Sequence, residues 1–175
     1  MNGSLGRRLM AGAAALTLGG LGAVAVQAPA YAADFSAPFT CTAPVLGTQN
    51  VTIDGSLTAT PNPAAVGAPA AFALRITQIS LRAPVAINSW TMTANLDVSG
   101  AETTQFPITG SGGRVPANQP ITGSLAGTWT PTVAGVDEFR GGTVTVKANV
   151  VLLGAITVDC VPGDTRPVAE TLTVS

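Results

Sequence analysis

The stretch that decides the fold is residues 143–160, TVTVKANVVLLGAITVDC. In its first half, apolar and polar residues alternate, which is the period-two pattern of a half-buried β-strand. A turn near Leu153-Gly154 leads into a second strand, in which Ile156 has the same parity as Cys160. The stretch therefore predicts a β-hairpin whose second strand points Cys160 toward the core.

Cys41 is the only other cysteine of the sequence. Two cysteines in an exported chain most often form one disulfide, so we expect a Cys41–Cys160 bond. Such a bond closes nearly the whole domain into a loop, which in the chain-entropy model stabilises the fold by about 4–5 kcal/mol. The alternative is a pair of buried free thiols.

The first 32 residues have the composition of a secretory signal peptide. Arg7 and Arg8 precede an apolar run rich in Ala, Leu and Gly over residues 9–26, and an A-x-A cleavage motif occupies residues 30–32. We expect cleavage after Ala32, with cleavage two residues earlier as the nearby alternative. The arginine pair leaves the twin-arginine export route open beside the general secretory route.

Residues 33–175 provide enough chain for one hydrophobic core and not for two. Without the two signal arginines, six basic residues face nine acidic ones, and the net charge is −3. No basic stripe is present, so nucleic acid is not an expected partner. No second apolar run is long enough to span a bilayer. We therefore expect a single extracellular domain, released or held at the cell wall by non-covalent contacts.

Short strand-like segments follow one another along this domain, separated by turns rich in Gly, Pro and Asn. They lie at residues 49–60, 72–81, 90–99, 107–111, 121–129 and 133–139, in the two halves of 143–160, and at 170–174. Seven to nine such strands favour an all-β, immunoglobulin-like antiparallel β-sandwich. We expect irregularities at Gly55 and Gln78, where a glycine or a change of parity interrupts the pattern. The cysteines bracket almost everything, so a true immunoglobulin domain is not expected.

Residues that could carry catalysis are sparse. Histidine does not occur, which removes Ser-His-Asp and Cys-His arrangements and most zinc sites. Lys147 is the only lysine and alternates outward. The single adjacent acidic pair, Asp137-Glu138, is interpreted as a solvated turn, with a calcium site as the alternative because calcium prefers oxygen ligands. We therefore expect no catalytic residue, no metal and no cofactor.

The aromatic residues divide into two groups. Trp90 and Phe72 have the parity of core positions. Trp129, beside a Thr-Pro turn, and Phe139, between two charged residues, are the candidates for exposed ligand contacts. Such side chains could bind carbohydrate or peptide if they lay exposed together.

Residues 39–49, FTCTAPVLGTQ, and the late Cys160 followed by a short terminal strand resemble a group of uncharacterised secreted domains from actinobacteria. Those domains occur in exported, often cell-surface-associated proteins and have no assigned activity. The resemblance implies the link between Cys41 and Cys160, and it supplies no further functional residue.

Three functions are compatible with these observations. The first is a non-enzymatic secreted protein with a structural or adhesive role in the cell envelope or the extracellular space. The second is a module that binds carbohydrate or cell-wall material, with a wall polysaccharide or another surface protein as partner. The third, least favoured because histidine is absent, is a small secreted hydrolase or hydrolase inhibitor.

Overall fold

The computed structural model describes residues 33–44 and 46–175, so the signal peptide predicted for residues 1–32 lies outside the described part. The described chain forms nine β-strands and no helix. They are β1 (Ala33–Ala43), β2 (Gly47–Thr60), β3 (Ala70–Ile79), β4 (Ile87–Gly100), β5 (Thr104–Gly112), β6 (Ile121–Trp129), β7 (Gly135–Val150), β8 (Gly154–Pro162) and β9 (Glu170–Val174). A search of these residues for a helix able to cross a membrane finds none.

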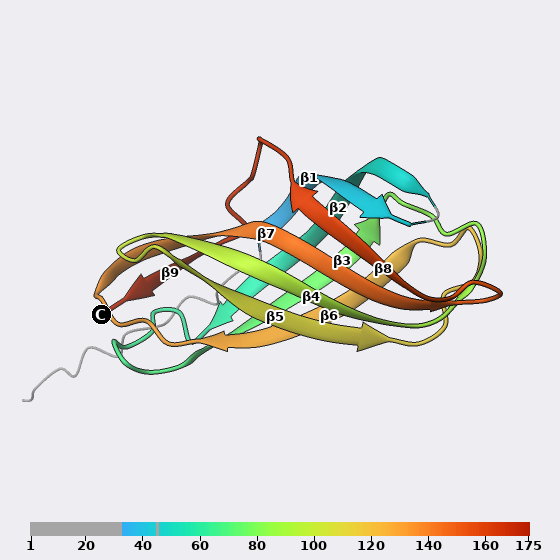
Figure 1. The fold of residues 1–175 in the computed structure, drawn as a ribbon. Helices are drawn as coiled ribbons and strands as arrows, with labels where there is room; N and C mark the ends of the chain where they lie inside the picture. Colours follow the sequence, from blue (N-terminus) through green and yellow to red (C-terminus); the bar gives the residue numbers. More distant parts are fainter. Residues whose placement is uncertain (1–32, 45) are drawn as a thin grey trace, which may run out of the picture.

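The strands pair antiparallel in the order β4-β5-β6-β3-β2-β1-β8-β7-β9, and β7 also pairs with β4. The sheet therefore closes on itself and folds into two layers (Figure 1). One layer contains β1, β2, β3 and β6, and the other contains β4, β5, β7, β8 and β9. Two narrow seams join them: one residue pair between β5 and β6, and four residue pairs between β1 and β8. The predicted all-β sandwich and its disulfide are confirmed.

Strand β4 shows why the sequence folds in this way. Trp90, Met92 and Ala94 are buried, while the residues between them face outward or lie partly covered. The strand has neighbours along both edges, β5 on one and β7 on the other. Every second side chain is thus removed from water, which is the main stabilising contribution of such a strand.

The hairpin expected at residues 143–160 is present, but its first strand is longer than predicted. β7 begins at Gly135 and runs to Val150, so the segment predicted as a separate strand or loop at 133–139 is its first part. Gly141 and Gly142, which directly precede the stretch 143–160, lie inside this strand. At Gly142 an added Cβ would lie 2.7 Å from the Asp97 carboxylate and 3.0 Å from a backbone oxygen of β4. Close approach of β4 therefore explains a glycine in mid-strand.

The irregularities expected at Gly55 and Gln78 are confirmed. The register of β2 against β3 shifts between Asp54 and Gly55, where an added Cβ would lie 2.5 Å from the Arg75 carbonyl oxygen. The register of β3 against β6 shifts between Ile76 and Ile79. Both shifts lie in the same layer, where β2 and β3 bend across the core.

The two ends of the sandwich differ. At one end lie the β1–β2 turn and the connections at residues 80–86, 113–120 and 151–153; we call this the open end (Figure 1, right). At the other end lie the connections at residues 61–69, 101–103 and 130–134, together with the C-terminus; we call this the closed end.

Trp90 covers the seam between β5 and β6 near the open end. Its buried ring lies over Gly112 of β5 and Gly123 of β6, and an added Cβ would meet the ring at 2.3 Å and 2.5 Å respectively. Only glycine fits at these two positions, because the Trp90 ring takes up the space of a side chain. The predicted core position of Trp90 is confirmed.

Replacing Gly112 with alanine should force the Trp90 ring out of its position. We expect Gly112→Ala to lower the free energy of unfolding by about 1–3 kcal/mol, as overpacked cores do. The neighbouring Gly113→Ala is the matched control, because an added Cβ there meets no atom within 4 Å. Urea unfolding of both variants measures the difference, and equal midpoints would contradict the packing described.

Candidate functional site

The two aromatic residues expected to make ligand contacts are buried. Trp129 is 9% exposed and Phe139 is 0% exposed, so the prediction that they form an exposed contact is wrong. Trp129 is drawn into the core by pairing of β6 with β3, which places it opposite Ala70. Phe139 is flanked by charged residues in the sequence, but its strand has β4 on one edge and β9 on the other.

Both side chains belong to an aromatic cluster in the half of the core nearer the closed end. The shortest separation of ring centroids, 4.6 Å, joins Phe72 and Phe139, and the Trp129 ring lies 5.5 Å from Phe139 and 6.1 Å from Phe106. Separations in this range are typical of favourable aromatic packing. The cluster is therefore a stabilising part of the core.

The acidic pair also differs from its prediction. Asp137 is 0% exposed and lies within β7, so the interpretation as a solvated turn is wrong for this residue. Its Oδ1 accepts the backbone N–H of Glu102 at 2.8 Å, while its Oδ2 is buried without a hydrogen-bond partner. Glu138 is half-buried and forms an ion pair with Arg140 at 2.6 Å. Adjacent residues of a strand point to opposite faces, which separates the two carboxylates.

Among the residues that the structure describes, no three His, Cys, Asp or Glu side chains lie close enough together to hold a metal ion. The buried carboxylate of Asp137 caps the turn that follows β4, where it accepts a hydrogen bond from the N–H of Glu102.

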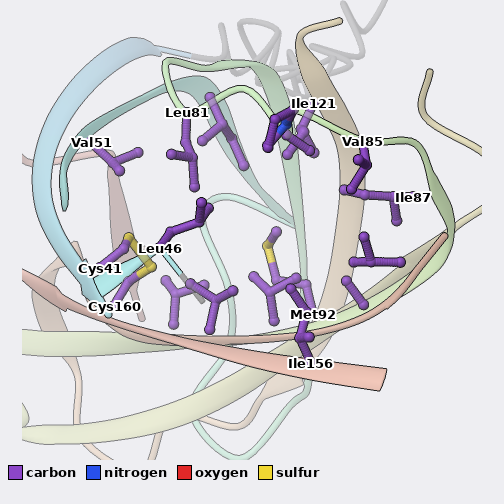
Figure 2. Close-up of a pocket in the computed structure, with 18 of the residues that line it drawn as sticks. Cys41, Leu46, Val51, Leu81, Val85, Ile87, Met92, Ile121, Ile156 and Cys160 are labelled. Carbon is purple, nitrogen blue, oxygen red and sulfur yellow. A yellow bond between two sulfur atoms is a disulfide. The ribbon is translucent and has the colours of Figure 1, made fainter. Parts of the chain in front are cut away.

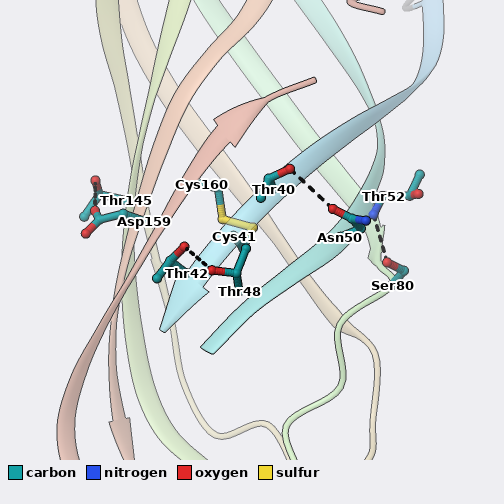
Figure 3. Close-up of a disulfide and its surroundings, with 10 residues drawn as sticks. All are labelled: Thr40, Cys41, Thr42, Thr48, Asn50, Thr52, Ser80, Thr145, Asp159 and Cys160. Atoms are coloured by element: carbon teal, nitrogen blue, oxygen red, sulfur yellow. Dashed lines mark hydrogen bonds between the residues drawn. A yellow bond between two sulfur atoms is a disulfide. The ribbon is translucent and has the colours of Figure 1, made fainter. Parts of the chain in front are cut away.

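The disulfide lies on the seam between β1 and β8. Cys41 stands directly opposite Cys160 in the antiparallel register, with the two Cα atoms 3.9 Å apart. Both side chains are buried, and the inward position of Cys160 agrees with the prediction from the parity of the hairpin. Around the bond, threonines, Asn50 and Asp159 form hydrogen bonds between neighbouring strands (Figure 3).

Beside this disulfide the core is hollow. A cavity of about 110 Å³ lies between the layers near the open end, and only apolar atoms line it. Figure 2 shows the disulfide on one side of it and Val85 and Ile87 on the other. The lining consists of aliphatic residues, Met92 and the disulfide: Cys41, Leu46, Val51, Ile53, Ile79, Leu81, Ala83, Pro84, Val85, Ile87, Met92, Ile121, Val144, Val146, Ala148, Val150, Leu153, Ile156, Val158 and Cys160.

A second, smaller cavity of about 40 Å³ continues along the interior toward the closed end. Ile53, Met92 and Val144 line both cavities and therefore form the partition between them. Met92 is the most adaptable of the three, because its unbranched side chain has several rotatable bonds. A change of its rotamer would alter the length of the available space.

The larger cavity reaches the surface at the open end, because Pro84 and Leu153 both line it and are themselves exposed. The connections around this opening are held together by hydrogen bonds. The Val151 N–H donates to the Ala86 carbonyl at 2.9 Å, and the Asn118 N–H donates to the Ala83 carbonyl at 2.8 Å. The opening therefore has a defined rim.

The cavity could not be predicted from the pattern of the sequence. Its lining comes from many strands and loops, and each of these residues by itself has the pattern of an ordinary core position. One feature of the sequence agrees with it: none of the seven Trp and Phe residues lines the cavity, whereas four of them form the cluster toward the other end. A core whose large side chains gather at one end leaves space at the other.

Comparison with known protein families and with curated proteins finds no match to the chain.

The unpaired oxygen of Asp137 yields a stability prediction. Asp137→Asn keeps an oxygen acceptor for the N–H of Glu102 at nearly the same side-chain volume, so we expect the free energy of unfolding to change by less than about 1 kcal/mol. Asp137→Ala removes the acceptor and should lower it by about 1–3 kcal/mol. Thermal or urea unfolding compares the two variants, and an asparagine as damaging as the alanine would contradict the role of Asp137 as a hydrogen-bond acceptor.

Proposed function

We propose that this chain is a non-enzymatic, exported domain of the cell envelope or extracellular space, and that it works by binding an apolar molecule. The observation that carries the proposal is the cavity at the open end, which has an entirely apolar lining and reaches the surface. Ligand sites in proteins are typically concave and mostly apolar. The disulfide and the predicted signal peptide support the exported location.

The cavity is costly to leave empty. A void of about 110 Å³ lowers stability by roughly 2–3 kcal/mol, at the cost per unit volume measured for cavities in protein cores. An apolar ligand regains this loss, because it supplies the missing van der Waals contacts and leaves water itself. Engineered apolar cavities of about 150 Å³ stay dry and admit benzene. A small apolar molecule or the end of an alkyl chain therefore matches the size and the chemistry.

Carbohydrate or cell-wall binding has less support. Sugar recognition through Trp129 and Phe139 requires exposed rings, and both rings lie in the core. A hydrolytic activity also has little support, since histidine does not occur in the sequence and Lys147, its one lysine, is exposed on the outer face of β7. A structural or adhesive role is compatible with the proposal, because ligand binding and attachment can share one domain. We also propose that the chain is related to the actinobacterial secreted domains that it resembles.

Substitution of Val158 tests the proposed site. Its side chain lines the cavity from β8, so Val158→Phe places a ring in the space that the ligand would take. We expect affinity for 1-decanol to fall by about tenfold or more, because the ring and the ligand would have to share one space. Overpacking of apolar atoms costs about 1–3 kcal/mol. The free energy of unfolding should stay equal or rise, because the ring fills a void. Methyl NMR titrations, with the Met92 signal as reporter, measure the binding.

Thr157→Phe is the matched control. Thr157 is the preceding residue of β8 and is exposed, so the same ring lies outside the core. This variant should bind 1-decanol as the unsubstituted protein does. The proposal fails if the unsubstituted protein binds no 1-decanol, or if both variants lose binding equally.

A further inference from the structure

The open end combines exposed apolar side chains with one sign of charge. Leu152 is 94% exposed at the tip of the β7–β8 hairpin, and Leu153 beside it is 49% exposed. Arg82 and Arg114 are exposed in the two longer connections of this end. The sequence places no acidic residue in any of its four connections.

The closed end also exposes apolar side chains, among them Val66 and Val133, but its loop charge has the opposite sign. Its connections at residues 61–69, 101–103 and 130–134 contain no basic residue and one acidic residue, Glu102. The remaining connection, residues 163–169, carries one charge of each sign, Asp164 and Arg166. The two ends of the molecule therefore differ in the sign of their loop charge, although the overall net charge is negative. A negatively charged surface would attract the open end and repel the other.

The backbone at Leu152 supports a role for its side chain. Its φ of 69° lies in the left-handed region, which residues other than Gly, Asn and Asp seldom adopt. In a packed core such a conformation can be offset by contacts, but the Leu152 side chain is almost wholly in solvent. No packing contact of the side chain therefore offsets the unfavourable backbone conformation of Leu152. An unfavourable conformation without such compensation suggests a function for the residue.

The exposed leucines adjoin the opening of the cavity. Leu153 lines the cavity, whereas Leu152 does not. The hairpin is joined to the 80–86 connection by the Val151 hydrogen bond, and the Arg82 guanidinium donates to the Asn118 carbonyl at 3.2 Å. The hairpin and the connections that carry the two arginines therefore form one rim around the opening, and hydrogen bonds hold its parts together (Figure 1).

We propose that the open end docks on an anionic lipid surface. In this arrangement Leu152 inserts among the acyl chains, while Arg82 and Arg114 lie near the headgroup phosphates. A leucine tip flanked by cations and free of carboxylates matches the boundary between headgroups and acyl chains. Docking turns the cavity toward the bilayer, so that an acyl chain can enter without crossing water; this uptake step rests on the function proposed above.

Vesicle flotation tests the docking with the exported protein, residues 33–175, which contain every described strand and the disulfide. We expect binding to vesicles of equal parts phosphatidylcholine and phosphatidylglycerol, and weaker binding to phosphatidylcholine alone. Leu152→Asn should lower binding by about tenfold while preserving the turn, because asparagine accepts the left-handed conformation. Arg114→Glu should lower binding to the anionic vesicles by about fivefold or more.

Val133→Asn is the matched control, since Val133 is an exposed apolar residue in a connection of the closed end. It should bind vesicles as the unsubstituted protein does. No vesicle binding, or equal losses in Leu152→Asn and Val133→Asn, would overturn the docking. Titration of the same samples with 1-decanol separates the two proposals: uptake of 1-decanol without vesicle binding refutes only the docking, and vesicle binding through Leu152 without uptake refutes only the apolar site.

Discussion

The contact between β1 and β8 closes the sheet, and the interior of the protein depends on it. Only four residue pairs join these strands, and the disulfide lies within them. The bond links residues 119 positions apart, so in the chain-entropy model it stabilises the fold by about 5 kcal/mol. It also forms part of the cavity wall. The same bond therefore holds the two layers together and borders the space between them.

The distribution of side-chain volume explains why this space is hollow. Two facing sheets pack about 10 Å apart, and the gap must be filled by the side chains that point into it. Toward the closed end Phe72, Phe106, Trp129 and Phe139 fill it. Toward the open end the inward residues are aliphatic, and Trp90 is used to cover the seam between β5 and β6. Aromatic rings therefore fill the half of the core toward the closed end, and the half toward the open end has room for a ligand.

Features set by local pattern could be predicted from the sequence. Alternation identified the strands, and parity placed Cys160 and Trp90 inward. The burial of Phe139 and Asp137 could not be predicted in this way, because the register of β7 against β4 shifts opposite Ala94–Leu96. Before the shift the buried positions of β7 are odd-numbered, and after it they are even-numbered. The prediction that Trp129 is exposed was wrong because β3 and the aromatic cluster enclose its side chain. A cavity is still less predictable, because it reflects the summed volumes of residues from the whole chain.

The most direct test of the apolar site is a crystal structure of the protein soaked with 1-bromodecane, whose bromine can be located by anomalous scattering. A bromine peak inside the cavity, near Met92 and Val158, with the rest of the alkyl chain leaving through the opening, is the result that we predict. Two results would contradict it: ordered water in the cavity, or side chains of the open end that have closed the space with no bromine inside.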